Sequence, residues 1–436
     1  MNVEPTTAPS TTVPSTTVQS TTVQSTTNAS NITQPSVSPD PSSRRVVSLD
    51  IFRGLTMAVM IFVNALPESG GLPWWTHHAH ATEDRMTYVD MVFPFFLFIV
   101  GMSLPLSIAR RLKKNPSTLA LWPHIFLRSL SLLVLGLILA NAEGADTARM
   151  GLSGSVWAIL ALLSAALYLN VYPRSKTFRP YAIALRIIGF AGTLILLAIF
   201  RRTTASGHVA WLDFSYPEIL GLIGISYFAS ALVYIPTRNS KSMQWIWFIL
   251  FLTLNIVSSA HLWLFPLHVP LYIWPFGNGA MPCIILAGVV TANLLMPSQT
   301  STPFIPKLWP TLVFGIGMLL AGFLLTPLGI SKIRATPTWC LYSAGAAAIM
   351  IAGLYWLCDI RRHTAWAFLL RPAGSNTLLT YLLPDFWYFL TVAVGFTWID
   401  AHFAYGAPVV LKTIAFTLVM LAISAGLTRL KLRLQL

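Results

Sequence analysis

The stretch HHAHATEDRMTYVDMVFPFF, residues 77–96, places three histidines and three acidic residues directly before a long apolar segment. His78 and His80 precede Asp90 by 12 and 10 residues. An imidazole titrates near neutral pH, so it can accept a proton, relay one or carry an acyl group. A nearby carboxylate would fix its tautomer and stabilise the imidazolium. The sequence therefore makes His78, His80 and Asp90 candidates for proton or acyl transfer.

Two other roles for these histidines remain open at this point. Three histidines can bind a metal ion, but HHAH lacks the i, i+4 helical spacing of zinc hydrolases, and the chain contains no HExxH motif. We therefore predict no metal site. Isolated histidines are also common in surface loops, so a loop without a chemical role is the other alternative.

The composition indicates a protein embedded in the lipid bilayer. Of the 436 residues, 55% are hydrophobic and 10% are charged, whereas soluble domains carry about 25% charged residues. The net charge is +14, but no basic run alternates with aromatic residues in a soluble segment. Basic loops beside membrane spans explain the charge better than nucleic-acid binding does, and we expect no nucleic-acid partner.

Apolar segments of roughly 17–24 residues recur along the chain, and each is long enough to cross a bilayer as a helix. We therefore predict an all-α polytopic transmembrane helix bundle with about 11–12 spans, formed by residues 44–436. Residues 1–43 are a Ser/Thr-rich repeat that cannot bury a core, and we expect a disordered tail there. The predicted spans are 47–66, 88–108, 119–141, 152–172, 181–200, 216–236, 244–265, 279–296, 308–329, 338–358, 376–398 and 408–428.

Lysine and arginine predict the orientation of the bundle. If the spans alternate in direction, 18 of the 28 basic residues lie on the same side as the N-terminus and six lie on the other side. Positive charge favours the cytosolic side. We therefore expect a multi-pass protein of the cell (inner) membrane, with the tail and both termini in the cytosol. His78, His80 and Asp90 then lie at the outer face.

Several polar residues fall inside the predicted spans, where they are costly unless they are paired or functional. Asp50 and Arg53 share one helical face near the cytosolic end of the first span, and Asn64 ends that span on the outer side. Glu218 begins the sixth span and Asp385 follows a proline in the eleventh. The simpler alternatives are an internal ion pair for Asp50 and Arg53, a helix-start carboxylate for Glu218, and a kinked, water-lined cavity for Asp385.

Two motifs early in the chain carry a resemblance to a known family. RVVSLDIFRGLTMAVMIFVN, followed by a histidine-bearing loop and TYVDMVFPFFLFIVGMSLPLS, resembles the transmembrane acyltransferase family of heparan-α-glucosaminide N-acetyltransferase and its bacterial relatives. Three later segments also resemble motifs of this family. They are EILGLIGISYFASAL, ISKIRATPTWCLYSAG and GSNTLLTYL.

The resemblance implies a function. Members of that family move an acetyl group from cytosolic acetyl-CoA to the amino group of a hexosamine across the membrane. It implies a catalytic histidine, either His78 or His80, together with Asn64 and Asp90. The PWW sequence before the loop matches bacterial relatives whose spacing favours His78.

The remaining site predictions follow from the same resemblance and from the orientation. Asp50, Arg53 and Asn376 are the candidate acetyl-CoA contacts, with Arg53 facing a phosphate. Candidate contacts to an amino sugar or glycan acceptor are Lys332, Thr336, Glu218 and Asp385. For Lys332 and Thr336, a role at the membrane interface before the tenth span is the simpler alternative.

We therefore predict an acetyl-CoA-dependent membrane acyltransferase that uses no metal. The alternatives are a transporter or flippase, which intramembrane acids and proline breaks also suit, and an inactive scaffold that retains the family fold. Glycines at 315, 317 and 322 permit close helix packing within one chain or between two chains, which leaves a homodimer open.

Overall fold

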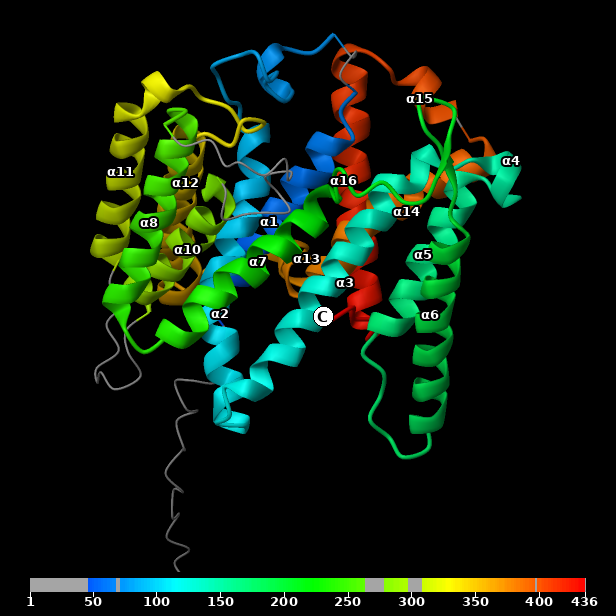
Figure 1. Cartoon of the computed structure of the whole chain (residues 1–436), viewed down its shortest axis with the longest axis horizontal. Coiled ribbons are helices and arrows are strands. Elements are labelled where there is room, and N and C mark those ends of the chain that lie inside the picture. Colours follow the sequence, from blue (N-terminus) through cyan, green and yellow to red (C-terminus); the bar gives the residue numbers. More distant parts are fainter. Residues whose placement is uncertain (1–45, 68–70, 263–277, 297–307, 397, 436) are drawn as a thin grey trace, which may run out of the picture. The chain divides into compact units, whose positions relative to one another are not determined.

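The computed structural model describes residues 46–67, 71–262, 278–296, 308–396 and 398–435 (Figure 1). The predicted tail, residues 1–43, lies outside the described residues and stays a prediction. The α-helices are α1 (Val47–Asn64), α2 (Val92–Lys114), α3 (Trp122–Asn141), α4 (Thr147–Met150), α5 (Gly154–Leu169), α6 (Arg179–Ile199), α7 (Glu218–Thr237), α8 (Lys241–Ser259), α10 (Ala280–Leu295), α11 (Leu308–Leu324), α12 (Pro337–Tyr355), α13 (Leu370–Ser375), α14 (Thr377–Val394), α15 (Trp398–His402) and α16 (Gly406–Arg429).

Short elements connect these helices. The ones that matter below are the 3-10 turns η2 (Trp74–Thr76) and η3 (Val89–Met91) and the π-helix η7 (Trp356–Ile360). In the described part of the chain, β-structure amounts to one antiparallel pair, β1 (Arg202–Thr203) with β2 (Val209–Ala210), and two isolated bridges. The fold is therefore all-α, as predicted.

Nine helices within the described ranges are long and apolar enough to cross a membrane: α1, α2 with η3, α3, α6, α7, α8, α12 with η7, α14 and α16. Three shorter apolar helices, α5, α10 and α11, correspond to the other predicted spans. Large aliphatic side chains on α6, such as Ile187, Ile188 and Ile195, are exposed. Such a surface suits contact with lipid rather than water. The chain is therefore a multi-pass membrane protein.

Close backbone contacts join pairs of helices that are distant in sequence. A Cβ atom on Gly101 of α2 would lie 1.8 Å from the carbonyl oxygen of Ile285 on α10, and one on Gly374 of α13 would lie 1.8 Å from the carbonyl oxygen of Asp50 on α1. Only glycine permits such an approach, as is common between membrane helices. These contacts fix α10 beside α2 and α13 beside the start of α1.

The glycines of α11 pack mainly within the chain. A Cβ atom on Gly315 would lie 2.8 Å from the Ile349 side chain, and one on Gly322 would lie 3.0 Å from the Tyr342 ring. Both neighbours belong to α12, whereas Gly317 has no neighbour within 4 Å. Gly315 and Gly322 therefore serve the packing of α11 on α12, the intrachain alternative.

The connecting segments gather at two ends of the bundle. The loop after α1, the loop between α11 and α12, and helix α15 lie together at the top of Figure 1. The α2–α3 and α5–α6 connections lie at the bottom. We call the first the histidine end, because it carries residues 77–80, and the second the opposite end. Helix α1 runs from the opposite end to the histidine end.

The start of α1 is held by a residue from much later in the chain. The Asp359 carboxylate in η7 accepts hydrogen bonds from the backbone N–H groups of Val47, at 3.0 Å, and Ser48, at 2.9 Å. The first N–H groups of a helix lack partners within the helix, and an acidic group also complements the positive end of its dipole. Asp359 therefore acts as the N-terminal cap of α1, and no local sequence signal pointed to it.

Candidate active site

The loop after α1 brings His78 to Asp90. The Nδ1 atom of His78 lies 2.7 Å from Oδ1 of Asp90, and the aspartate side chain is 1% exposed while the histidine side chain is 43% exposed. The other carboxylate oxygen accepts the backbone N–H groups of Thr87, at 3.0 Å, and Ala79, at 3.3 Å. The buried acid is thus fully hydrogen-bonded, while its imidazole partner reaches the surface.

Asp90 is fixed from a second direction. It lies in η3 at the start of α2, and its carbonyl oxygen accepts the indole N–H of Trp339 at 3.0 Å. Trp339 is buried on α12 and stacks on Phe93 at a centroid distance of 6.5 Å. Helices α2 and α12 therefore both hold the carboxylate in place.

This geometry determines which imidazole nitrogen is available. An ionised carboxylate only accepts hydrogen bonds, so Nδ1 carries a hydrogen and donates it to Asp90. In the neutral ring the lone pair then lies on Nε2. That nitrogen is able to accept a proton or attack a carbonyl carbon. The His78–Asp90 pair therefore has the arrangement of a general base with an orienting acid.

A lysine from the loop before α12 lies against the same ring. The Lys332 ammonium is 3.4 Å from Nδ1 and 3.5 Å from Nε2 of His78. Two nearly equal distances mean that the ammonium is in line with neither nitrogen. Burial lowers the pKa of Lys332, while the negative charges of Asp90 and Glu218 act in the opposite direction. The lysine thus adds a positive charge beside the imidazole.

The loop that carries Lys332 is tied to the histidine loop. Arg334 forms an ion pair with Asp84, which lowers the pKa of that carboxyl. Thr336 is buried, and its hydroxyl oxygen accepts the backbone N–H of Ser331 at 3.0 Å. Thr336 therefore shapes the loop rather than facing the imidazole.

His80 differs from His78 in its surroundings. Its backbone N–H donates to the Glu83 carboxylate at 3.1 Å, and its side chain is exposed. The same Glu83 pairs with Arg85 at 2.7 Å, and Arg85 lies 4.5 Å from the ring centroid of Trp74. The structure thus brings His78 to Asp90, and it places the backbone of His80 in the ion-paired turn that follows.

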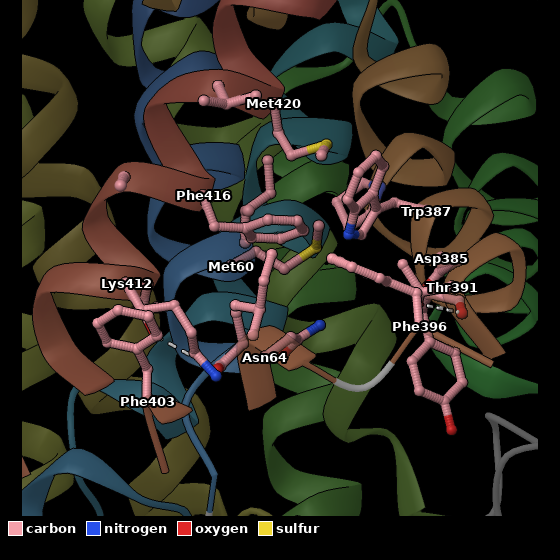
Figure 2. Close-up of a pocket in the computed structure, with 18 of the residues that line it drawn as sticks. Met60, Asn64, Asp385, Trp387, Thr391, Phe396, Phe403, Lys412, Phe416 and Met420 are labelled. Carbon is pink, nitrogen blue, oxygen red and sulfur yellow. Dashed lines mark hydrogen bonds between the residues drawn. The ribbon is translucent and has the colours of Figure 1, made fainter. Parts of the chain in front are cut away.

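Asn64, the last residue of α1, connects two cavities. A small cleft of about 20 Å³ is bordered by Asn64, Met60, His78 and Lys332. A large cavity of about 850 Å³ between α1, α14, α15 and α16 is bordered by the same Met60 and Asn64. Figure 2 shows Asn64 in the large cavity, between Lys412 and Asp385. Asn64 therefore faces both the imidazole cleft and the cavity.

The two other candidate acids belong to α7 and α14, and the charge of Glu218 acts on Lys332 beside the imidazole. Asp385 follows Pro384 in α14 and borders the large cavity. Glu218 begins α7 with a φ of +53°, and its carboxylate accepts the backbone N–H of Ile219 at 3.1 Å. A positive φ at a residue with a side chain is strained. Glu218 borders neither cavity, so the structure favours its helix-start role.

Asp50 and Arg53 lie near the opposite end. They form an ion pair at 3.1 Å, and Arg53 also donates to the Ser103 hydroxyl on α2. About 11 residues separate Arg53 from Asn64, which corresponds to about 16 Å along the helix. Neither residue borders the two cavities described above. Their contacts fit the alternative of an internal ion pair.

Asn376 joins the opposite end to the C-terminal segment. Its amide group donates to the Thr428 hydroxyl at 3.0 Å and to the Leu432 carbonyl at 2.8 Å, and its oxygen accepts the Leu434 N–H at 3.2 Å. The side chain is buried. Because these groups are used within the fold, Asn376 is a poor candidate for a coenzyme contact.

Sequence reasoning missed three features of this region. It selected Lys332 for a sugar but gave no sign of its contact with His78, 254 residues away. It did not select Lys412 or Trp387, which border the large cavity. Lys412 carried a usable signal, since it is a charged residue inside a predicted span. Among the described residues, no group of three His, Cys, Asp or Glu side chains is arranged to hold a metal ion.

Comparison with known proteins gives a family and two relatives. Residues 45–263 match a family described as "Domain of unknown function (DUF5009)". Heparan-alpha-glucosaminide N-acetyltransferase of Mus musculus is 38% identical over 100 residues, which is 23% of this chain and 14% of the mouse protein. The Homo sapiens enzyme is 38% identical over 97 residues, 22% of this chain and 14% of the human protein. The matches confirm the resemblance and span about one seventh of each relative.

Proposed function

Because this chain belongs to the DUF5009 family and shares sequence with membrane N-acetyltransferases, we propose that it is a membrane acyltransferase that moves an acetyl group from acetyl-CoA to an amino sugar or related glycan. The observation that carries this proposal is the 2.7 Å contact between His78 and the buried, fully hydrogen-bonded Asp90. A buried carboxylate behind an exposed imidazole is the arrangement that acyl transfer needs.

In the proposed reaction, the amine nitrogen of the acceptor attacks the thioester carbonyl carbon. The new C–N bond forms and the C–S bond breaks. The amine proton passes to Nε2 of His78 and then to the departing CoA thiolate, while Asp90 stabilises the transient imidazolium. A two-step route through an acetyl-histidine uses the same atoms, with the imidazole as the first nucleophile.

The neighbours of His78 have proposed roles as well. Asn64 would donate its amide hydrogens to the thioester oxygen or to the acceptor, and the Lys332 charge would stabilise the oxyanion that develops. Asp385 is a candidate acceptor contact at the edge of the large cavity. Arg53 with Asp50 remains the predicted coenzyme contact, with the internal ion pair as the simpler role. The excess of Lys and Arg on the side of the N-terminus supports an orientation in which the histidine end faces outward.

The proposal is tested with the purified full-length chain in lipid nanodiscs and radiolabelled acetyl-CoA. We expect CoA release and acetylated glucosamine from the wild type. His78→Ala should lose about 10²–10⁴-fold in rate, which is the typical contribution of a general base. His80→Ala, two residues away and also exposed, is the matched control and should stay within about twofold.

The same assay separates the rival functions. A protein that releases no CoA with any amine or sugar, and whose His78→Ala variant binds and behaves as the wild type does, would be a transporter or an inactive scaffold. The large cavity is the observation that favours a carrier among these rivals, because it adjoins intramembrane polar groups. Label retained on the protein would distinguish an acetyl-histidine from direct transfer.

A further inference from the structure

Asn64 and Lys412 lie together in the large cavity, and we call this part its polar end, although Phe403 also lies there. Lys412, Phe416 and Met420 lie four residues apart on one face of α16, and all three border the cavity. Lys412 is nearest the start of the helix, and eight residues of helix span about 12 Å. On α1, Asn64 is the last residue and Met60 lies one turn deeper. Figure 2 shows Asn64 beside Lys412, with Phe416 and Met420 progressively further away.

Aromatic and aliphatic side chains surround most of this space. Besides Met60, Phe416 and Met420, the lining includes Trp387, Phe396 and Phe403. The volume of about 850 Å³ lies near the upper limit for sites that bind small molecules, and an apolar lining with a few polar groups at one place is typical of them. The lining thus matches a ligand with a polar head and a long apolar part.

Several apolar residues that border the cavity are exposed. Leu411, Val419 and Trp387 border it and are 67%, 51% and 39% exposed. All three belong to the membrane-spanning helices α14 and α16. Exposed apolar residues on such helices face lipid. An aliphatic chain could therefore enter from the bilayer without crossing water.

The polar end of the cavity adjoins the imidazole cleft. Met60 and Asn64 border both spaces, and His78 and Lys332 border the cleft. The charges of the lining residues argue against binding of the nucleotide part of CoA in the large cavity. Among the described lining residues there is one lysine, Lys412, and one carboxylate, Asp385, whereas a polyanionic nucleotide is typically bound by several cations.

We propose that the acceptor is an amino sugar linked to a lipid, whose aliphatic chain occupies the large cavity and whose amino group lies beside Asn64 and His78. This inference rests on the proposed acyl transfer, and it names the acceptor class. The chemical step is unchanged. The lipid chain takes no part in it and contributes binding energy and position.

The first experiment compares two acceptors that differ in the chain alone, methyl β-D-glucosaminide and hexadecyl β-D-glucosaminide, with the protein in nanodiscs. We expect kcat/KM for CoA release to be about 100-fold or more higher with the hexadecyl compound. Burial of a few methylenes suffices for that ratio. Equal kcat/KM values for the two acceptors would overturn the proposal.

Two variants on α16 test whether the lipid chain binds in the large cavity. Ala415 borders the cavity, so Ala415→Trp should narrow it and reduce the preference for the hexadecyl compound, with the methyl rate unchanged. Leu418 is 51% exposed on the same helix and does not border the cavity. Leu418→Trp is therefore the matched control and should keep the hexadecyl preference. An undiminished preference in Ala415→Trp would contradict the assignment.

A binding measurement separates this inference from the proposed function. A hexadecyl glucosaminide with a diazirine at the end of its chain should cross-link to α14 and α16 in the wild type and in Leu418→Trp, and less in Ala415→Trp. Cross-linking to α14 and α16 in a wild-type protein that releases no CoA would refute the proposed acyltransferase activity and support the lipid site. CoA release from the methyl compound, with cross-links confined to other helices, would refute the lipid site and leave the acyltransferase.

Discussion

The two ends of α1 both carry buried carboxylates, but they use them differently. At the opposite end, both oxygens of Asp359 accept backbone N–H groups of α1, and Asp50 pairs with Arg53, which also donates to Ser103. At the histidine end, Asp90 is equally well hydrogen-bonded, but one of its partners is an imidazole that is 43% exposed beside a cavity.

The difference separates structural polar groups from candidate catalytic ones. A buried carboxylate is stable wherever its hydrogen bonds are complete, so burial alone says nothing about chemistry. What distinguishes Asp90 is that its partner His78 is partly exposed and borders a cleft. At the opposite end, the described contacts join one part of the fold to another, and close glycine packing of α13 surrounds them.

The largest expected effect is at the histidine end. Asp90→Asn keeps the size of the side chain, but the amide can donate to Nδ1 and so favour the other tautomer. We expect a loss of about 10³–10⁴-fold in the rate of CoA release. The thermal unfolding midpoint should be measured in parallel. A variant that keeps more than a tenth of the activity would mean that the carboxylate does not orient the base.

The second largest effect is expected at the opposite end of α1. Arg53→Met removes the guanidinium partner of the buried Asp50, and we expect a loss of about 3 kcal/mol in the free energy of unfolding. If the pair is internal, the KM for acetyl-CoA should change by less than about twofold in protein that remains folded. A tenfold rise in KM with unchanged kcat would instead establish Arg53 as the coenzyme contact that the sequence predicted.

A smaller effect is expected for the charge beside the imidazole. Lys332→Met should lower kcat/KM about tenfold at neutral pH, because one oxyanion-stabilising charge is lost. Burial lowers the pKa of Lys332 from its ordinary value of 10.5, and the ammonium is present only below its pKa. The ratio of wild-type to variant activity should therefore shrink as the pH rises towards 10. Lys332→Arg stays charged throughout, so a similar shrinkage in that control would assign the effect to another group.

The smallest effect is expected for the ion pair between the two loops. Arg334 lowers the pKa of Asp84 from its ordinary value of 3.8, so the pair stabilises the fold above that pH and the contribution disappears as the pH falls through the lowered pKa. Asp84→Asn should lower the thermal unfolding midpoint by about 1 °C at pH 7. The difference from wild type should shrink as the pH falls below 3.8. A drop that persists in acid would point to packing rather than charge.

Sequence alone predicted the parts of this molecule that depend on local composition. Apolar segment length is a local property, so the predicted spans correspond to the nine long and three shorter apolar helices. The ends were less accurate, since α2 continues to Lys114, beyond the predicted end at residue 108. Close motifs also indicated the family, which the comparisons confirm.

Contacts between residues far apart in the sequence could not be predicted from local composition. The resemblance favoured His78, but the residues alone left both His78 and His80 open, because the path of the loop back to Asp90 depends on η2, η3 and their packing. The contact of Lys332 with His78 and the three hydrogen bonds of Asn376 join segments more than 50 residues apart. Nothing in the local pattern specifies such pairs, so the candidate site was predicted as a set of residue types rather than as a geometry.

The Asp359 cap has a consequence for biosynthesis. Val47 and the residue that caps it are 312 positions apart, so a ribosome working at about 10 residues per second needs about half a minute to supply the partner. During that time the leading amides of the first helix lack this partner and need water or another acceptor. The N-terminal half of the chain, made alone, would therefore lack the group that completes its first helix.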